Sequence, residues 1–118
     1  MSDNFRAPPF SVAVGRDGPT ATVAILGELD IATTPQLRAA IASLEPGYAK
    51  LVIDLSRCSF FASSGISILL DEHDRGQGEG FGVVVIKAQP DVQRMFDLAR
   101  LGEMLTFQES DTARRAPS

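Results

Sequence analysis

Residues 51–73 read LVIDLSRCSFFASSGISILLDEH, and this stretch decides the fold class. It begins with Leu51-Val52-Ile53, a short apolar run that is typical of a central strand covered on both faces. A polar loop is predicted over residues 56–64, between this strand and a helix. The helical spacing of four residues predicts that they share one packed face of that helix: Ile66, Leu69, Leu70 and His73. A buried strand that leads through a loop into an amphipathic helix predicts an α/β domain.

The chain upstream of this stretch predicts a hairpin and a first helix. Residues 10–15 and 20–26 alternate apolar with other side chains, as half-buried strands do, and Asp17-Gly18 between them favours a tight turn. Thr34-Pro35 predicts a helix start, with a hydroxyl at the cap and proline at the first helical position. Pro46-Gly47 ends this helix, whose buried face is predicted to hold Leu37, Ala40, Ile41 and Leu44.

The chain downstream continues the alternation of helix and strand. The second helix is predicted to close at the glycines of residues 76–80, and residues 83–86, VVVI, predict another buried strand. Pro90 opens a third helix, and residues 105–107 form a last short strand. This order predicts one α/β domain with a mixed sheet, antiparallel at its N-terminal edge and parallel in its centre, with helices mainly on one face. We expect that domain to span residues 10–109, with flexible segments at 1–9 and 110–118.

Composition narrows the classes of function. The 118 residues suit one domain, and 44% hydrophobic with 22% charged residues is ordinary for a globular protein. A formal net charge of −4 argues against nucleic-acid binding, because it repels phosphate backbones. Cys58 is the only cysteine, so no intramolecular disulfide or Cys/His zinc framework is expected, which fits a reducing cytosol. No apolar run approaches the ~20 residues of a membrane-spanning helix, so we expect a cytoplasmic protein.

Residues that could support enzyme chemistry are few. His73 is the only histidine and lies about 13 Å along the predicted helix from Ser64, too far to act as its base. The GxSxG pattern of a nucleophile elbow is missing. Asp71, Glu72 and Asp74 are interpreted as solvated acids, with no further ligands to complete a metal site. We therefore expect no catalytic residues, no metal and no cofactor, and a small hydrolase is only a remote alternative.

Two polar motifs remain, each at the end of a predicted strand. Gly27-Glu28-Leu29-Asp30 ends the second strand of the hairpin and precedes the first helix. Ser63-Ser64-Gly65 precedes the second helix, where free backbone N–H groups and the positive end of the helix dipole would stabilise a phosphate. A serine at this position can instead simply cap the helix. Both interpretations hold if one serine caps the helix and the other is modified.

Together these motifs resemble the STAS domain, the fold of bacterial anti-sigma factor antagonists. The resemblance rests on Gly27-Glu28-Leu29-Asp30 followed by a proline-capped helix, and on Val52-Ile53-Asp54-Leu55-Ser56 followed by Ser63-Ser64-Gly65. It covers residues 10–109. In that family an unphosphorylated antagonist binds an anti-sigma factor, an ATP-dependent serine kinase, and frees a sigma factor for transcription, often in stress responses. Phosphorylation reverses the binding, and a PP2C-type phosphatase resets the switch.

The resemblance also assigns roles to residues of this chain. It places the phosphorylated residue at Ser63 and the aspartate of the Gly-Glu-Leu-Asp motif, which lies close to it, at Asp30. The surface that binds the partner is predicted to comprise Asp30, Thr33, Thr34, Ser59, Phe61, Ala62, Ser63, Ser64 and Gly65. The antagonist would be a monomer or a weak dimer.

Ala62 departs from the family pattern, which has aspartate at this position. The replacement removes a negative charge beside the acceptor hydroxyl, so the usual kinase loses a feature that it could recognise. Two hypotheses follow. Either a divergent kinase still phosphorylates Ser63, which we favour because both serines and the glycine are present, or the domain is an interaction module that does not switch.

Overall fold

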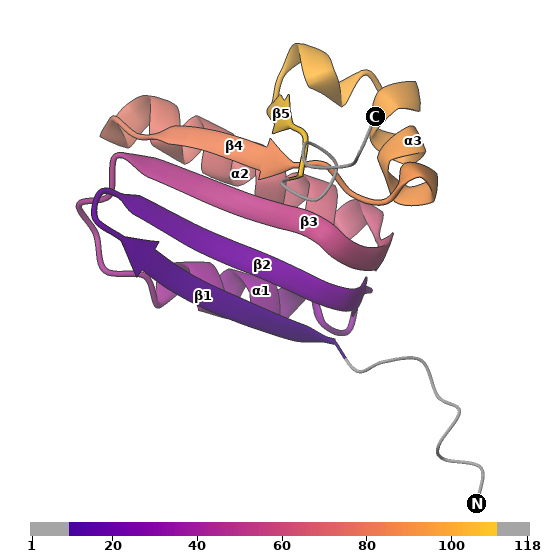
Figure 1. Ribbon diagram of the computed structural model, residues 1–118, viewed down its shortest axis with the longest axis horizontal. Coiled ribbons are helices and arrows are strands. Elements are labelled where there is room, and N and C mark those ends of the chain that lie inside the picture. The colour runs from indigo at the N-terminus through magenta and orange to yellow at the C-terminus, as the bar shows by residue number, and fades with distance from the viewer. Residues whose placement is uncertain (1–9, 111–118) are drawn as a thin grey trace, which may run out of the picture.

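The computed structural model of the protein describes residues 10–110, which form one mixed sheet and three α-helices (Figure 1). In chain order the elements are β1 (Ser11–Asp17), β2 (Thr20–Leu29), α1 (Thr34–Ala42), β3 (Lys50–Phe61), α2 (Ser63–Glu79), β4 (Gly82–Ile86), α3 (Pro90–Leu98), a 3-10 helix (Leu101–Glu103) and β5 (Thr106–Gln108). The expected flexible segments, residues 1–9 and nearly all of 110–118, lie outside the described residues.

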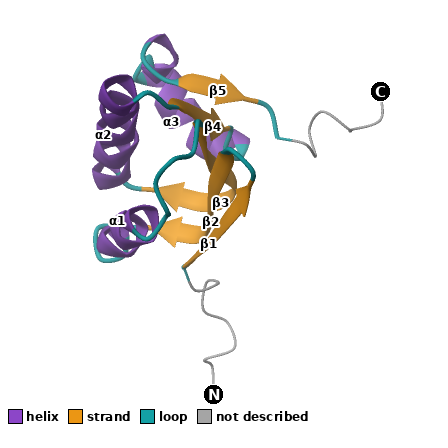
Figure 2. Cartoon of the chain, turned by 90° about the vertical axis from the view of Figure 1, so that its left-hand side faces the viewer, coloured by secondary structure: helices purple, strands orange, loops and turns teal. Residues whose placement is uncertain are grey.

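The strands lie in the sheet in the order in which they occur in the chain. β1 pairs with β2 in the antiparallel direction, and β2, β3, β4 and β5 are parallel neighbours. Figure 2 shows α1 and α2, two of the three helices, on one side of this sheet. The predicted α/β class, the mixed sheet and the placement of the helices are therefore confirmed.

The hairpin turn forms where the sequence predicts it. Gly18 has a φ of +58°, and Asp17 pairs directly with Thr20 across the turn. The burial expected for the first strand is wrong, however: Val14 is 51% exposed. β1 is an edge strand whose only sheet neighbour is β2, so it has less to pack against than the inner strands.

The core lies between the sheet and the helices. β2 and β3 alternate buried with half-exposed residues, so they are covered on one face only, and the prediction of a central strand covered on both faces is wrong. Fully buried side chains from the strands and helices include Val23, Ile25, Leu29, Leu37, Leu51, Ile53, Leu55, Ile68, Leu69 and Phe96.

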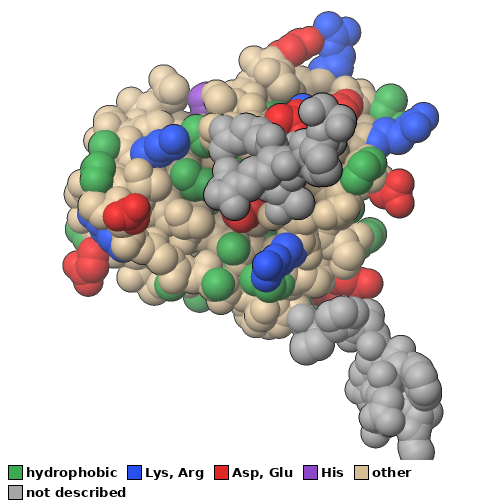
Figure 3. All heavy atoms as spheres, in the orientation of Figure 1, with side chains coloured by type: hydrophobic (Ala, Val, Ile, Leu, Met, Phe, Trp, Pro, Cys, Tyr) green, Lys and Arg blue, Asp and Glu red, His purple; other side chains and the backbone are tan. Residues whose placement is uncertain are grey.

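On the other face of the sheet, the strand residues that the structure describes are half-buried or exposed. On this face, drawn in Figure 3, hydrophobic side chains form small separate groups between charged ones. Its inner strands present half-buried residues such as Val52 and Asp54. Among residues 10–110, no helix is both long and apolar enough to cross a membrane.

β3 extends much further than the sequence predicts. In place of a polar loop over residues 56–64, the strand continues to Phe61 and pairs with β2 as far as Leu29. Two register shifts interrupt this pairing, one between Ala24 and Leu26 and one between Gly27 and Glu28. Each places an extra residue in β3, and the buried positions become every third residue, at Leu55, Cys58 and Phe61.

The helix boundaries and faces differ from the predictions in detail. α1 begins at Thr34 with Thr33 as its N-cap, one residue before the predicted cap, and it ends at Ala42. α2 continues through the glycine-rich segment to Glu79. Its buried face is shifted by one residue from the predicted stripe and consists of Gly65, Ile68, Leu69, Glu72 and Gly76.

Gly65 allows α2 to start close against the strand ends. A Cβ added at this residue would lie 2.5 Å from Cδ2 of Leu29 and 2.6 Å from Cζ of Phe61. Both neighbours are buried, so neither side chain has room to move away. The first turn of α2 can therefore pack on β2 and β3 only if residue 65 has no side chain.

We predict that Gly65→Ala destabilises the fold by about 1–3 kcal/mol, because the added methyl group overpacks this contact. Gly78→Ala is the matched control: residue 78 lies on the same helix and a Cβ there meets nothing within 4 Å. The control should gain about 0.5–1 kcal/mol from helix propensity. Urea unfolding measures the free energy of unfolding of both variants. An equal change in the two variants would show that the contact of Gly65 with Leu29 and Phe61 does not limit the side chain at residue 65.

Candidate functional site

The carboxyl ends of β2 and β3 meet at the start of α2. The backbone N–H of Ala62 donates a hydrogen bond of 2.9 Å to the carbonyl oxygen of Leu29, and α2 begins at the next residue, Ser63. The connection between strand and helix is therefore the single residue Ala62. This short connection, together with the packing of Gly65, fixes the position of both serines relative to the end of β2.

Asp30 and Thr33 close the turn between β2 and α1 by reciprocal hydrogen bonds. The N–H of Thr33 donates to Oδ1 of Asp30 at 2.9 Å, and the N–H of Asp30 donates to Oγ1 of Thr33 at 2.9 Å. The Thr33 hydroxyl also donates to Oδ1 of Asp30 at 2.9 Å. Asp30, which the sequence analysis assigned to the partner surface, therefore also organises its own turn.

These hydrogen bonds keep Asp30 ionised. Donation from the hydroxyl and then from the backbone N–H of Thr33 lowers the pKa of the Asp30 carboxyl below its usual value. Asp30 is exposed, so its negative charge is presented to solvent at neutral pH. The hydrogen-bonded Asp30 carboxylate therefore stabilises the folded state. This stabilisation is fully present above the pKa of Asp30 in the unfolded chain, and it is lost as the pH falls through the lower pKa of the folded state.

Ser64 is held by a chain of hydroxyl groups that joins the two helix starts. The Thr34 hydroxyl donates to the carbonyl oxygen of Asp30 at 2.8 Å. A hydroxyl has one hydrogen, so in the 2.8 Å contact between Thr34 and Ser64 the donor must be Ser64. With Ser63 as the modified residue, Ser64 would be the serine that caps α2. This expectation is wrong, because the Ser64 side chain bonds to α1 instead.

Ser63 differs from Ser64 in both exposure and bonding. Ser63 is the first residue of α2 and is exposed, whereas Ser64 is half-buried. Among residues 10–110, no group forms a hydrogen bond with the Ser63 hydroxyl. Of the two serines, Ser63 has the hydroxyl that is free to react.

The start of α2 has no anionic group of its own. Its N-cap is Ala62, which has an extended backbone (φ −73°, ψ 159°) and no side-chain oxygen, and its first turn contains no acidic residue. The first N–H groups of a helix have no intrahelical partner and attract anions. An anionic group on Ser63 would therefore meet the first N–H groups of α2, of which that of Gly65 already donates to the carbonyl oxygen of Ala62 at 2.9 Å, and no acid within its own turn.

The predicted partner surface divides by burial. Asp30, Ser59 and Ser63 are exposed and Thr33, Ala62 and Ser64 are half-buried, so all of these can contact a partner. The remaining predicted residues are buried, so they cannot form much of a contact surface: Thr34, Phe61 and Gly65. They support the neighbouring residues of the surface from below.

Two exposed hydrophobic residues were missed by the sequence analysis. Ile31, in the turn after Asp30, is 80% exposed, and Phe60, the neighbour of buried Phe61, is 49% exposed. Ile31 could have been found as an apolar residue in a polar turn, whereas the exposure of Phe60 depends on the register shifts of β3. We call the exposed residues of this region, together with half-buried Ala62, the serine edge: Asp30, Ile31, Ser59, Phe60, Ala62 and Ser63.

The other candidates for chemistry have structural environments. Cys58 is buried, its Sγ lies 3.1 Å from the carbonyl oxygen of Phe60, and burial raises the pKa of the thiol, which keeps it protonated. His73 is half-buried on α2. Within residues 10–110, no group of three or more His, Cys, Asp or Glu side chains is arranged to hold a metal ion.

Comparison with known proteins gives one family and several similar structures. The family described as "Mlab, STAS domain" matches residues 12–106. A crystal structure of an anti-sigma factor antagonist from Mycobacterium paratuberculosis has 30% sequence identity over 89% of this chain and 90% of that chain, with a TM-score of 0.74.

Two structures of SpoIIAA are similar in fold, each at 20% identity. The anti-sigma factor antagonist in its unphosphorylated form covers 88% of this chain and 93% of that chain, with a TM-score of 0.72. The Bacillus cell fate determinant in its phosphorylated form covers 90% of this chain and 96% of that chain, with a TM-score of 0.64.

We predict that Ala62→Asp stabilises the fold by about 0.5–2 kcal/mol, because residue 62 already has N-cap geometry and lacks only the acceptor. Ala62→Asn supplies the acceptor without the charge and should recover most of this gain. Urea unfolding of the three proteins measures the effect. Unchanged stability in both variants would mean that a side chain at residue 62 does not reach the N–H groups of α2.

Proposed function

The chain belongs to the STAS domain family, and from that premise we propose that it is an anti-sigma factor antagonist. In this proposal the unphosphorylated protein binds an anti-sigma factor and so regulates transcription that depends on a sigma factor. Phosphorylation of Ser63 releases the partner. The observation that carries the proposal is the contrast between the free, exposed hydroxyl of Ser63 and the bonded hydroxyl of Ser64. The similar antagonist from Mycobacterium paratuberculosis supports the general role.

The partners are those of the family. We infer an anti-sigma factor of the ATP-dependent serine kinase type, which would bring the nucleotide and Mg²⁺ itself, and a PP2C-type phosphatase that removes the phosphate. This chain is the substrate in both reactions, so it needs no catalytic residue. The binding surface is the serine edge, in which Ile31 and Phe60 supply apolar area and Asp30 supplies a negative charge.

The switch acts through charge and needs no refolding. A phosphoserine adds about −1.5 to −2 charges at pH 7, and a helix N-terminus stabilises an anion by roughly 0.3–1 kcal/mol. The free N–H groups of α2 therefore favour the modified form within the isolated domain. In a complex the same charge would be buried without a partner, which costs several kcal/mol, and every 1.4 kcal/mol weakens binding tenfold.

A second candidate function rests on Ala62. With no carboxylate at this N-cap, a kinase that recognises the family aspartate has no such group to bind. The domain would then bind its partner permanently through the serine edge. Ala62→Asp separates the two candidates, because it should restore phosphorylation by such a kinase if the missing aspartate is the cause.

We predict that an anti-sigma factor kinase recovered from a bacterial lysate by the unmodified chain phosphorylates Ser63. Peptide mapping after incubation with this kinase, ATP and Mg²⁺ should find the phosphate on Ser63. Ser63→Ala should lose it, and Ser64→Ala, the matched control, should still be modified. Phosphate on Ser64 would contradict the assignment. Stable binding without phosphate on any serine would favour the module that does not switch.

A further inference from the structure

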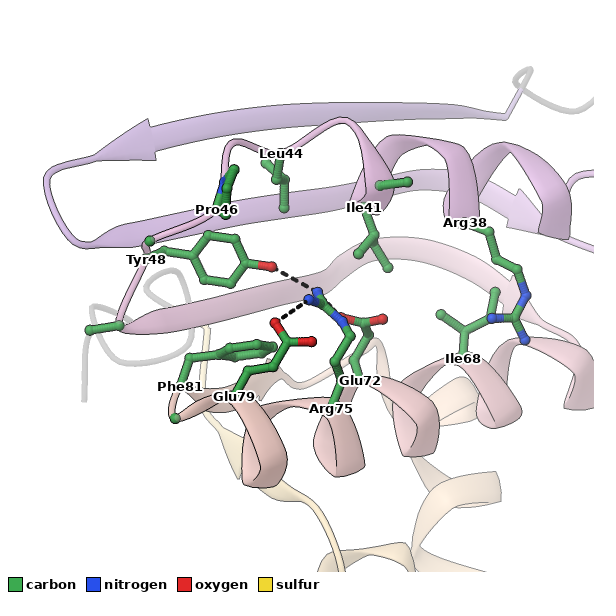
Figure 4. Close-up of a pocket in the computed structure, with 14 residues that line it drawn as sticks. Arg38, Ile41, Leu44, Pro46, Tyr48, Ile68, Glu72, Arg75, Glu79 and Phe81 are labelled. Carbon is green, nitrogen blue, oxygen red and sulfur yellow. Dashed lines mark hydrogen bonds and ion pairs between the residues drawn. The ribbon is translucent and has the colours of Figure 1, made fainter.

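A cavity lies between α1 and α2, at the end of α2 away from the serines (Figure 4). Its volume is about 610 Å³, within the range of roughly 300–1,000 Å³ that small-molecule sites occupy. Ser63 and Arg75 are separated on α2 by a rise of about 18 Å. This groove is therefore distinct from the serine edge, and a ligand site in it does not depend on the proposed function.

One part of the groove is apolar and aromatic. The rings of Tyr48 and Phe81 pack edge to face with their centroids 5.0 Å apart. The remaining apolar lining includes Ile41, Leu44, Pro46 and Ile68. These side chains offer a hydrophobic surface to the body of a ligand.

A charged cluster centred on Arg75 lies beside these two rings in the groove. Its guanidinium donates to Oε1 of Glu72 at 3.1 and 2.6 Å, to Oε1 of Glu79 at 3.1 Å and to the hydroxyl of Tyr48 at 2.8 Å. It also lies over the ring of Phe81, 4.9 Å from the centroid. Arg75 is thus held on several sides, and its positive charge is paired with the carboxylates of Glu72 and Glu79.

Glu72 is the unexpected member of this cluster. The sequence predicts a solvated acid at this position, but Glu72 is only 8% exposed, because α2 turns this residue toward the sheet and α1. Its second oxygen, Oε2, has no hydrogen-bond partner among residues 10–110, and it is not sealed from solvent. Glu72 lines the groove, so Oε2 is an acceptor available to a ligand there.

The charges of the groove do not balance. Two carboxylates, Glu72 and Glu79, share one guanidinium, that of Arg75. The buried Glu72 pairs with it at 2.6 Å, so the excess negative charge is that of Glu79, whose side chain is 59% exposed. Arg38 at the groove lining does not supply the missing cation, because it pairs with Asp71 at 3.1 Å. A buried carboxylate with a free oxygen favours a positively charged donor over an anion or a neutral acceptor.

We propose that the groove between α1 and α2 binds a small amphipathic cation, a primary amine attached to an aromatic or apolar body. The ammonium group donates to Oε2 of Glu72 and gains from the charge of Glu79. The apolar body packs against Ile41 and Leu44 and against the rings of Tyr48 and Phe81. The groove thereby gives this protein a ligand site in addition to its partner surface.

Tryptamine is the probe that tests this inference, and indole-3-propionate, which carries a carboxylate in place of the amine, is its matched control. Titration of the full ¹⁵N-labelled chain with tryptamine should give saturable amide shifts at groove residues such as Ile41, Ile68 and Arg75. The control should give none. Equal binding of both compounds, shifts confined to other surfaces, or no shifts at millimolar tryptamine would overturn the proposal.

Substitutions at exposed positions of α1 and α2 test the groove without disturbing the core, so a loss of binding cannot be ascribed to unfolding. Glu79→Gln, at a side chain 59% exposed, should weaken tryptamine binding about two- to fivefold, and Asp74→Asn, which is on the same helix but outside the groove, should leave it unchanged. Ala42→Leu narrows the groove and should remove the shifts, whereas Ala39→Leu, on the same helix but outside the groove, should not. An equal effect of either variant and its control would count against the site.

Discussion

The close packing of Gly65 on Leu29 and Phe61 is the constraint on which the rest of the structure depends. It brings the start of α2 directly onto the ends of β2 and β3, where the hydrogen bond from Ala62 to Leu29 closes the junction. The only residue between β3 and α2 is Ala62. No longer loop is therefore present at this junction to cover the side chain of Ser63. The packing of the core therefore fixes which of the two hydroxyls is exposed.

The two serines at this junction differ in bonding and exposure. Ser64 gives its single hydrogen to Thr34 and links the two helices, while Ser63, one residue earlier, remains exposed at the positive end of α2. Ala62 leaves that end without a capping oxygen. The absence of a cap costs some stability, but it also leaves the N–H groups free for a phosphate.

The sequence predicts the order of the elements well because hydrophobic periodicity is a local property. Pro35 and Pro90 mark helix starts, and Asp17-Gly18 marks the hairpin turn. The length of β3 could not be predicted, since its register shifts depend on pairing with β2 and not on its own residues. The burial of Glu72 was missed for a similar reason: its partner Arg75 is held in turn by Tyr48, 27 residues away in the sequence. Ser63 was identified by resemblance, whereas the bond that occupies Ser64 depends on a contact between residues 30 positions apart.

We propose that a charge on Ser63 releases the partner while the fold stays intact. Isothermal titration of the anti-sigma factor against the unmodified and the authentic Ser63-phosphorylated chain, with melting curves of the same samples, tests it most directly. We predict an affinity loss of about a hundredfold or more, since a buried unpaired charge costs several kcal/mol. The melting temperatures of the two forms should remain close. Equal affinity of the two forms, or a loss of affinity that accompanies unfolding of α2, would contradict it.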